Sequence, residues 1–375
     1  MGSIWKKKAE TILSSAGIKI NGGEPWDITV KDERFYKRAL LGGSLGLGES
    51  YMDGWWESEK LDEFFTRVLK VRLDIRSTIK WSKILHSLSG IFLNKQSVKR
   101  AFEVGERHYD IGNDLYETML EERMVYTCGY WSGNPSAANL SEAQEAKLDL
   151  VCRKIGLKPG QKILDIGCGW GSFAKFAAEK YGVSVVGITI SKEQAELARK
   201  LCEGLPVEIK LLDYREIEGE FDHIVSLGMF EHVGYKNYRN YMKTARRCLK
   251  DGGLFLLHTI GGNKSAIDTD PWISRYIFPN GMIPSIVQIG KAIDGLFIME
   301  DWHNFGPDYD KTLMAWFKNF DDNWEKLKSK YDERFYRMWK YYLMVCAGSF
   351  RCRKNHLWQI VLSKNGVEGG YKAVR

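Results

Sequence analysis

Two ionisable residues, Glu231 and His258, each interrupt an otherwise apolar stretch of the sequence. Glu231 follows the predicted strand 221–227, and His258 lies within the predicted strand 253–260. Burying an ionisable group is costly unless the group has a partner or takes part in chemistry. The carboxyl ends of parallel strands face the ligand crevice of an open α/β sheet. Taken singly, a residue of this kind is more often a satisfied buried polar group; together, at neighbouring strand ends, the two favour a functional site.

A glycine-rich stretch, QKILDIGCGWGS at 161–172, marks a second candidate site. It predicts a buried strand at 162–166, a turn containing Gly167 and Gly169, and a helix at 172–181. Glycines in such a turn let backbone N–H groups approach a ligand closely, which suits an adenosine-type cofactor. The G-x-G-x-G spacing departs from the dinucleotide pattern, and the sequence lacks the triphosphate motif G-x-x-x-x-G-K-[ST]. A glycine turn without a ligand is the alternative.

Two acidic residues lie at the ends of predicted strands near this turn. Asp165 precedes the first glycine, and Asp213 ends a later apolar run. Carboxylates in these places could bind a cationic amino-acid tail and an adenine amine. This combination resembles the S-adenosylmethionine-dependent methyltransferases.

The composition favours a soluble cytoplasmic protein of two domains. The chain has 375 residues, a net charge of +7 and seven scattered cysteines, with no C-x-x-C pair. That cysteine pattern argues for a reducing compartment and against a zinc site. The sequence shows no signal peptide at its start and no apolar run of the ~18 residues needed to span a bilayer.

The positive charge is concentrated in residues 70–100, which contain eight basic residues and one acidic residue, Asp74. Val71, Ile75 and Ile79 recur there at helical spacing beside a basic stripe. A basic amphipathic helix predicts docking on an anionic phospholipid membrane surface. An ordinary solvated helix face and a contact with nucleic-acid phosphate are the alternatives.

The rest of the pattern predicts how the chain is organised. Residues 42–51, GGSLGLGESY, predict a glycine-rich turn that lets backbones pack closely, and 124–131 predict an exposed loop. The break in alternation after Gly261 predicts an insertion over the carboxyl edge of the sheet, where a lid belongs. Strands and helices alternate from residue 162, which predicts a parallel, doubly wound sheet; the predicted elements are 162–166, 172–181, 183–190, 191–203, 206–212, 221–227, 235–249, 253–260, 296–302, 309–328, 331–352 and 357–362.

Longer motifs extend this pattern along nearly the whole chain, and together they resemble the bacterial cyclopropane-fatty-acyl-phospholipid synthases in their full-length, two-domain form. The first of them separates these synthases from shorter mycolic-acid relatives. The motifs are GSLGLGESYMDGWW (43–56), HYDIGNDLY (108–116), YTCGYW (126–131), LDIGCGWG (164–171), VVGITIS (185–191), LGMFEHVG (227–234), HTIG (258–261), WISRYIFPNG (272–281), EDWHNFG (300–306), YDKTLMAW (309–316) and CAGSFR (346–351).

The resemblance implies an α/β fold of the class I S-adenosylmethionine-dependent methyltransferase type, with a Rossmann-like, mostly parallel mixed sheet and a smaller N-terminal α+β or helical domain. The implied division is a lipid- and membrane-docking domain at 1–93, a linker at 94–107 and a catalytic domain at 108–375. The resemblance further implies a homodimer on the inner face of the membrane that does not bind nucleic acid.

The implied reaction moves a methylene group from S-adenosylmethionine to the cis double bond of an unsaturated phospholipid acyl chain. Methyl addition leaves a carbocation, and a bicarbonate ion serves as the base before the ring closes. By the same resemblance the bicarbonate ligands are Cys128, Glu231, His258, the backbone of Ile260 and Tyr309, with Cys346 beside them. The implied cofactor contacts are Tyr126, Thr127, Asp165, Gly167, Gly169, Thr189, Gln194, Asp213 and Tyr214.

The chain departs from the family pattern at two small positions. Thr127 stands where serine is common, and Gly129 where alanine is common. Cys128 and Cys346 could instead be buried structural residues, which is the usual state of free cysteine.

Three other functions stay open. A related lipid C-methyltransferase would stop after methyl addition and give a methyl-branched product, and a further relative would methylate a small amine. A nucleic-acid methyltransferase is disfavoured, because the sequence has no Asn/Asp-Pro-Pro-aromatic motif. A non-catalytic lipid-binding module would not need Glu231 and His258 at strand ends.

Overall fold

The computed structural model describes residues 2–71, 112–133 and 135–375. The chain forms two compact units, each assembled from separated segments. The basic stretch 70–100 and the linker 94–107 fall almost entirely outside the described residues, so membrane docking and the domain boundary stay predictions. Unit 1 consists of Met1–Leu93, Asp268–Pro279 and Tyr309–Asn355, and unit 2 of Asn94–Ile267, Asn280–Asp308 and His356–Arg375.

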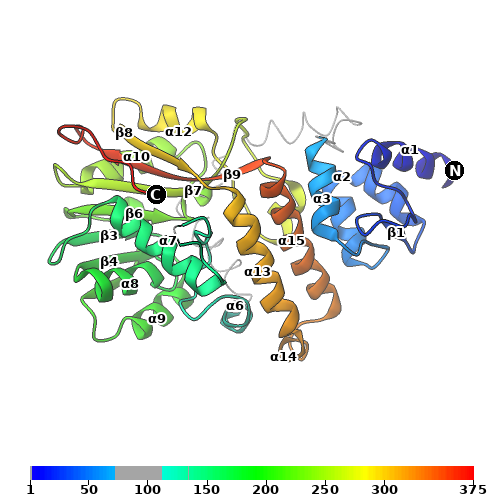
Figure 1. Ribbon diagram of the computed structural model, residues 1–375, viewed down its shortest axis with the longest axis horizontal. Helices are drawn as coiled ribbons and strands as arrows, with labels where there is room; N and C mark the ends of the chain where they lie inside the picture. The colour runs from blue at the N-terminus through cyan, green and yellow to red at the C-terminus, as the bar shows by residue number, and fades with distance from the viewer. Residues whose placement is uncertain (1, 72–111, 134) are drawn as a thin grey trace. The chain divides into compact units, whose positions relative to one another are not determined.

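Unit 2 is built on a seven-stranded sheet with the strand order β5-β4-β3-β6-β7-β9-β8 (Figure 1). The pairs formed among β3 to β7 are parallel, and β8 runs antiparallel to β9. The predicted sheet is therefore confirmed as mixed and mostly parallel. Its strands are β3 (Lys162–Ile166), β4 (Ser184–Thr189), β5 (Val207–Leu211), β6 (His223–Leu227), β7 (Leu254–Gly262), β8 (Ile298–Asn304) and β9 (Asn355–Ser363).

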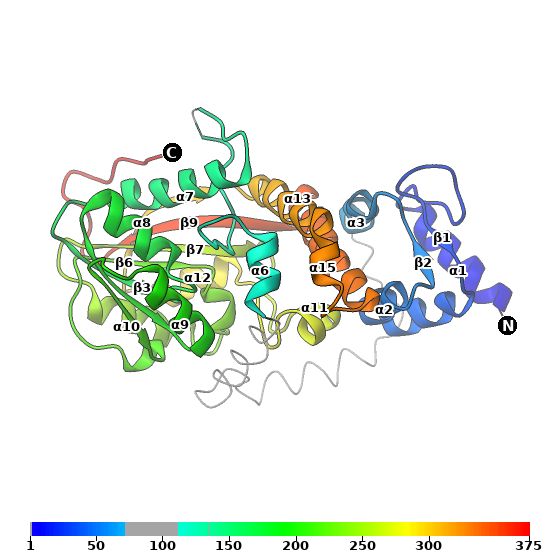
Figure 2. The same ribbon diagram turned by 90° about the horizontal axis from the view of Figure 1, so that it is seen from below.

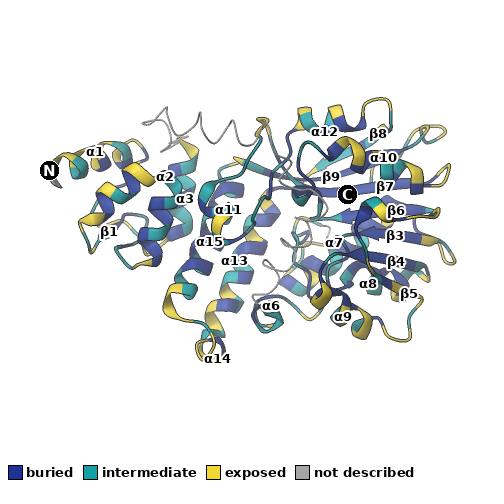
Figure 3. Ribbon diagram, turned by 180° about the vertical axis from the view of Figure 1, so that it is seen from behind, coloured by how far each residue is buried: buried dark blue, intermediate teal, exposed yellow. Residues whose placement is uncertain are grey.

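Helices cover both faces of this sheet, and alternate residues of each strand point to opposite faces. On one face Ile163 packs with α7 (Leu140–Lys154) and α8 (Ser172–Tyr181). On the other, Leu164 belongs to the core formed with α10 (Tyr238–Cys248) and α12 (Ile286–Ile293). Figure 2 shows the two helix pairs on opposite sides of the strands, and Figure 3 shows the inner strands β3, β4, β6, β7 and β9 as mostly buried. The remaining elements of unit 2 are α6 (Asn113–Met119), α9 (Lys192–Leu201) and the short helices η2 (Tyr214–Glu216) and η3 (Phe230–His232).

The helix α12 was not predicted, since the sequence indicated only an irregular insertion after Gly261. Its start carries a clear signal: Ser285 and Gln288 form a capping box, in which each side chain bonds to the other residue's backbone N–H. The serine and glutamine lie three residues apart, the spacing that marks a helix start.

Unit 1 is mainly helical. Its helix α3 (Leu61–Lys70) packs along α15 (Glu333–Arg351), and Phe65 lies edge-on to Tyr341 at a ring-centroid distance of 4.9 Å. Arg351 ties the same two helices together, because it donates to Asp62 on α3 at 2.6 Å. The other elements are α1 (Gly2–Ser14), β1 (Thr29–Val30), α2 (Arg34–Met52), β2 (Trp56–Glu57), α11 (Pro271–Tyr276), α13 (Pro307–Asp322) and α14 (Trp324–Leu327).

The glycine-rich segment 42–51 is helical, so the predicted turn is wrong. It forms the second half of α2, and the helix kinks at Gly43, whose φ is +58°. The predicted close packing is confirmed. A Cβ at Gly46 would lie 2.1 Å from the Arg38 carbonyl oxygen, and one at Gly48 would lie 2.3 Å from the Trp272 ring. The glycines thus permit close contact within a helix, at the cost of its intrinsic helix propensity.

None of the helices in the described segments is both long enough and apolar enough to cross a bilayer.

Candidate active site

The glycine turn follows β3 as predicted. Gly167 and Gly169 have φ values of +84° and +55°, a backbone region that other residues rarely adopt. The N–H groups of Gly167 and Cys168 both donate to the Ile188 carbonyl, at 2.9 and 3.0 Å. A Cβ added at Gly169 would meet nothing within 4 Å, which leaves open space beside the backbone. The turn therefore has the form needed to receive a ligand at the start of α8.

Asp165, the last residue but one of β3, is a buried ionisable group. It is 1% exposed, and neither of its carboxylate oxygens has a hydrogen-bond partner among the described residues. Burial raises the pKa of Asp165 to about 7, against the opposing effect of the Lys147 charge. A buried carboxylate of this kind can receive a cationic ligand group, so Asp165 fits the amino end of an amino-acid tail.

Two further predicted cofactor residues lie at the end of β4 and the start of α9. The Thr189 hydroxyl donates to Gln194 Oε1 at 2.9 Å, and both residues are buried. Ser191 caps α9, because its hydroxyl accepts from the Gln194 N–H at 3.3 Å. The structure thus brings this predicted pair into contact.

Asp213 follows β5 and caps η2, but its carboxylate is already engaged. It accepts from the Arg215 backbone N–H at 2.9 Å and from the Arg215 guanidinium at 2.9 Å. Beside it, the Tyr214 ring lies edge-on to Tyr241 at 5.0 Å, and burial raises the pKa of Tyr214 above its usual value.

Glu231 and Ile260, two predicted anion ligands, contact each other. The Ile260 N–H donates to Glu231 Oε1 at 2.6 Å, whereas Oε2 has no partner in the described parts of the chain. Burial raises the pKa of Glu231 to about 7. This carboxyl group is therefore poised to change its protonation state near neutral pH.

His258 lies on the neighbouring strand β7. Its Nδ1 is 3.3 Å from the Gln359 amide nitrogen on β9, and its Nε2 has no partner within the segments that the structure describes. Burial and the charges of Lys147 and Lys154 hold the pKa of His258 well below 6.5, so the ring is neutral. A neutral imidazole can donate a hydrogen bond or accept one, depending on its tautomer.

The segment 124–131 is a loop, as predicted, but it is buried rather than exposed. Cys128 has no exposed surface, and Tyr126 lies edge-on to Tyr116 at 5.1 Å. The exposure prediction was wrong because α7 covers the loop: Gln144 donates to the Thr127 carbonyl at 2.8 Å, and Lys147 to the Thr127 hydroxyl at 2.7 Å.

Tyr309 and Cys346, the two remaining predicted residues, belong to unit 1. Tyr309 lies on α13, with its ring 4.6 Å from Phe350 and 5.9 Å from Trp316. Cys346 lies on α15, and desolvation raises its pKa to about 12, so its thiol is protonated. The other predicted site residues all lie in unit 2.

Sequence reasoning missed three polar residues around this site. Gln359 interrupts the apolar run LWQIVL, the same signal that pointed to Glu231 and His258, and it could have been found. Gln144 and Lys147 gave no such signal, because polar residues are expected on the outside of a helix. Their burial depends on what packs against α7.

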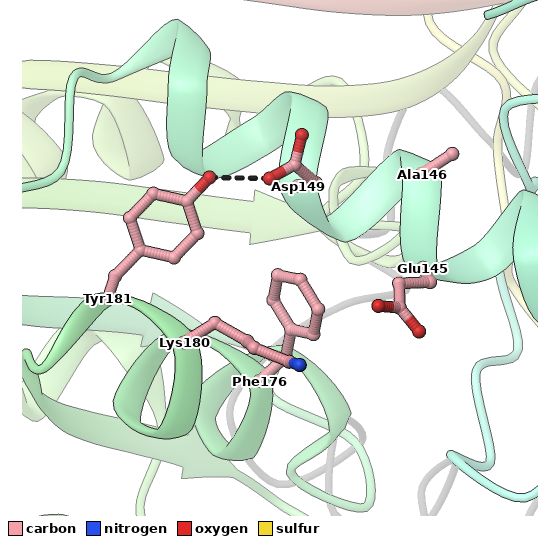
Figure 4. A pocket seen from close by; sticks show the side chains of 6 residues that line it. All are labelled: Glu145, Ala146, Asp149, Phe176, Lys180 and Tyr181. Carbon is pink, nitrogen blue, oxygen red and sulfur yellow. Dashed lines mark hydrogen bonds between the residues drawn. The ribbon is translucent and has the colours of Figure 1, made fainter. Parts of the chain in front are cut away.

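A surface hollow of about 450 Å³ lies elsewhere, between α7 and α8 (Figure 4). Tyr181 donates to Asp149 there at 2.6 Å, and the hollow contains none of the predicted site residues. It does not change the assignment of the site to the strand ends. The residues that line it are Glu145, Ala146, Asp149, Phe176, Lys180 and Tyr181.

The sequence and fold are similar to those of known proteins. Residues 96–360 match the family model described as mycolic acid cyclopropane synthetase. The chain is 53% identical over 371 residues to the cyclopropane-fatty-acyl-phospholipid synthase of Escherichia coli K12, covering 99% of this chain and 96% of that protein. It is 37% identical over 275 residues to a probable fatty acid methyltransferase of Pseudomonas putida, covering 70% and 69% of the two chains. Among solved structures, the crystal structure of mycolic acid cyclopropane synthase CmaA1 complexed with SAH and CTAB is 32% identical, with a TM-score of 0.65, and covers 70% of this chain and 98% of that one.

Proposed function

Because the chain belongs to the mycolic acid cyclopropane synthetase family, we propose that it is a cyclopropane-fatty-acyl-phospholipid synthase. It transfers a methylene group from S-adenosylmethionine to the cis double bond of an unsaturated acyl chain in a membrane phospholipid. The observation that carries this proposal is the 53% sequence identity, over nearly the whole chain, to a synthase of that name. The buried ionisable residues Glu231 and His258 at the strand ends of unit 2 support it.

The chain's residues fit the methyl donor. The positive-φ glycine turn leaves open space at Gly169, and the Asp165 carboxylate is available for the amino group of the donor. Thr189 and Gln194 face each other at the next strand end, where the ribose of the donor needs hydrogen-bond partners. Holding the sulfonium methyl group in line with the alkene compensates for the weakness of an alkene as a nucleophile.

The reaction breaks the carbon–sulfur bond of the donor and forms a new carbon–carbon bond. The alkene supplies the electron pair, so positive charge is left on the neighbouring carbon of the acyl chain. Aromatic faces stabilise such a cation, and the site must exclude water, which would quench it. Loss of a proton from the added methyl group then allows the ring to close.

We also propose that a bicarbonate ion binds at Glu231, His258, Cys128 and Ile260, all in unit 2; a part for Tyr309 and Cys346 rests on the resemblance alone. When bound, the ion supplies a weak base for the proton. Two observations support this assignment: Glu231 Oε2 and His258 Nε2 are buried and have no partner in the described residues. A protonated Glu231 carboxyl and a neutral imidazole are both able to donate a hydrogen bond to an anion.

The surroundings of the enzyme form the last part of this proposal. The basic residues in 70–100 fit an anionic phospholipid surface, which would bring the enzyme to the cytoplasmic face of the membrane. Association as a homodimer rests on the resemblance alone.

The decisive experiment supplies purified protein with S-adenosylmethionine and vesicles of a monounsaturated phospholipid. Each converted acyl chain should gain about 14 mass units, the mass of one CH₂, and should show the upfield proton resonances of a cyclopropane ring. Omitting dissolved carbonate from the buffer should slow turnover, and added bicarbonate should restore it. The absence of any ring product from this assay would contradict the proposal.

A second candidate is a lipid C-methyltransferase, favoured by the similarity to the fatty acid methyltransferase of Pseudomonas putida. In that reaction the intermediate cation would lose a proton from a carbon other than the added methyl group, and the product would also gain about 14 mass units. Mass alone therefore cannot separate the two reactions. A product that still reacts with ozone at a double bond would establish the second candidate.

A further inference from the structure

Lys147 on α7 is fully buried, and the proposed reaction does not use it. Its exposed fraction is 0%. Burying an ammonium group is costly, so a lysine in this position needs partners. Its Nζ donates to the Thr127 hydroxyl at 2.7 Å, while Gln144, one turn earlier on the same helix, donates to the Thr127 carbonyl at 2.8 Å.

Thr127 is held between α7 and the end of β6. Its methyl group faces Gly228, where an added Cβ would lie only 2.7 Å away. Lys147 therefore fixes the side chain of a residue that has little room to move. Because Tyr126 and Cys128 are the chain neighbours of Thr127, we expect loss of the Lys147 ammonium to displace them as well.

Lys147 also carries a charge that acts on the donor end of the site. The charge of Lys147 lowers the pKa of Asp165, against the burial that raises it. Burial lowers the pKa of Lys147 itself to about 8, so the ammonium is mostly charged at neutral pH. The groups that act on Lys147 through their charge are Cys128, Glu121 and Asp165, and Lys147 in turn acts on His258.

We infer that Lys147 is a positioning residue for the methyl donor: its ammonium orients Thr127 and favours the charged form of the Asp165 carboxylate, which the amino group of the donor requires. The inference rests on the proposed function, which makes Thr127 and Asp165 contacts of S-adenosylmethionine. It adds a residue that does not itself touch the donor.

The chain offers a matched control on the same helix. Lys154 is 1% exposed and lies seven residues further along α7. Its Nζ is 3.0 Å from His303 Nδ1 and 3.9 Å from Asp301, and Asp301 is also paired with Arg375 at 2.6 Å. Lys154→Met thus removes a second buried ammonium from α7 while leaving Thr127 and Asp165 unchanged.

The test measures the affinity of the full-length protein for S-adenosylhomocysteine by calorimetry between pH 5.5 and 8.5. S-adenosylhomocysteine carries the same amino-acid tail and cannot react. Wild-type affinity should fall as the pH drops through about 7, where Asp165 becomes protonated. In Lys147→Met the midpoint should move up by about one pH unit, and affinity at pH 7 should fall about fivefold, because the charged fraction of Asp165 falls from about one half to about one tenth. Lys147→Arg should restore the wild-type midpoint, and Lys154→Met should leave it unchanged.

Glu231 and Lys147 also titrate between pH 5.5 and 8.5, since their pKa values are about 7 and about 8, and the Asp165→Asn background separates the contribution of Asp165 from theirs. The remaining groups near Asp165 do not titrate in this range. They are Cys168, Cys202 and Tyr241. Burial raises the pKa of Cys202 to about 11 and those of Cys168 and Tyr241 well above their usual values, so none of the three changes charge in the measured range. The charge of Glu121 raises the pKa of Lys147. Any effect of Glu121 on the pH dependence of binding would remain in the Asp165→Asn background, which separates it from the effect of Asp165.

A further variant separates the two parts of the inference. Thr127→Val removes the hydrogen bond but leaves the charge, so it should weaken binding without moving the midpoint. A Lys147→Met midpoint equal to that of the wild type would overturn the inference, and so would a shift that persists in the Asp165→Asn background. If Asp165→Asn keeps the wild-type pH dependence, the inference fails because Asp165 does not bind the donor; ring formation, measured separately, would still stand.

Discussion

Glu231 shows most directly how the role proposed for a residue conflicts with stability. Its carboxyl group is buried, one oxygen has no partner in the described structure, and its pKa is raised to about 7 from 4.5. A carboxyl group buried in this way lowers the free energy of unfolding at any pH where the group is ionised in the unfolded chain but still protonated in the folded chain. The Ile260 N–H, which donates to the carboxylate at 2.6 Å, and the Thr259 hydroxyl offset part of this cost.

Replacing Glu231 by Gln should therefore stabilise the protein at high pH while it removes activity. Below pH 4.5 the carboxyl group is protonated in both the folded and unfolded states, so it has no effect on stability. Between about 4.5 and 7 only the unfolded state ionises, and wild-type stability falls as pH rises. The full difference is at most about 3 kcal/mol above pH 7.

The measurement is urea unfolding of wild type and Glu231→Gln at pH 5 and at pH 8, with turnover measured at pH 8. The free energy of unfolding of the variant should exceed that of the wild type at pH 8, and the difference should be smaller at pH 5. Turnover should fall by at least about a hundredfold, while affinity for S-adenosylhomocysteine stays within about threefold. Full turnover in the variant would remove Glu231 from the mechanism.

At the scale of single elements, the kinked helix α2 depends on glycines at particular positions. Gly46 lies so close to the Arg38 carbonyl that a Cβ would be 2.1 Å from the oxygen. Gly42, four residues earlier on the same helix, has open space within 4 Å of the Cβ position. Neither residue has a positive φ, so the two differ in available space rather than in backbone conformation.

We expect Gly46→Ala and Gly42→Ala to change stability in opposite directions. Gly46→Ala should destabilise the protein by about 1–3 kcal/mol through overpacking. Gly42→Ala should be neutral, or stabilising by up to about 1 kcal/mol, because alanine favours the helix. Differential scanning calorimetry of both variants tests this expectation. Equal effects of the two substitutions would show that the close contact at Gly46 has no energetic consequence.

The helix α7 illustrates how one element can position a segment that has no regular structure. Three of its residues, Ala143, Gln144 and Lys147, contact the loop that carries Thr127 and Cys128: a Cβ at Gly129 would lie 2.9 Å from the Ala143 methyl group. Glycine at position 129 therefore leaves room for the Ala143 methyl group. The loop forms no helix or strand of its own, so its contacts with α7 position it.

At the scale of the molecule, unit 1 is assembled from segments far apart in the sequence. The helix α3 ends at residue 70, and its partner α15 begins at residue 333. Arg351 on α15 pairs with Asp62, Glu63 and Asp310 at 2.6, 2.7 and 2.8 Å. Without α15, the buried ring of Phe65 would lose its contact with Tyr341.

Residues 1–93 expressed alone should therefore not fold cooperatively. The fragment would expose aromatic surface that Tyr341 covers in the whole chain, and the loss of that burial outweighs the remaining contacts. Circular dichroism should show helical signal without a sharp thermal transition, and the fragment should bind an apolar dye. A cooperative melting curve for the fragment would contradict this expectation.

The sequence by itself determined the parts of the protein that depend on neighbours along the chain. Alternating apolar runs predicted the strands of unit 2, and glycines at 167 and 169 predicted a tight turn, because φ preference and hydrophobic period are local properties. Glu231 and His258 could be found because a polar residue in an apolar run is visible in the sequence. The same local signals failed at 42–51, where glycine serves close packing in a helix rather than a turn.

Only the tertiary structure decided which residues meet. Gln359 lies beside His258, 101 positions away, and the segment 309–355 joins the N-terminal residues in one compact unit. Lys147 looks like any surface lysine in the sequence, and it is buried because a loop and a sheet cover that face of α7. Burial is set by what packs on a residue, and the energies of buried charges follow from it, so neither could be read from residue order alone.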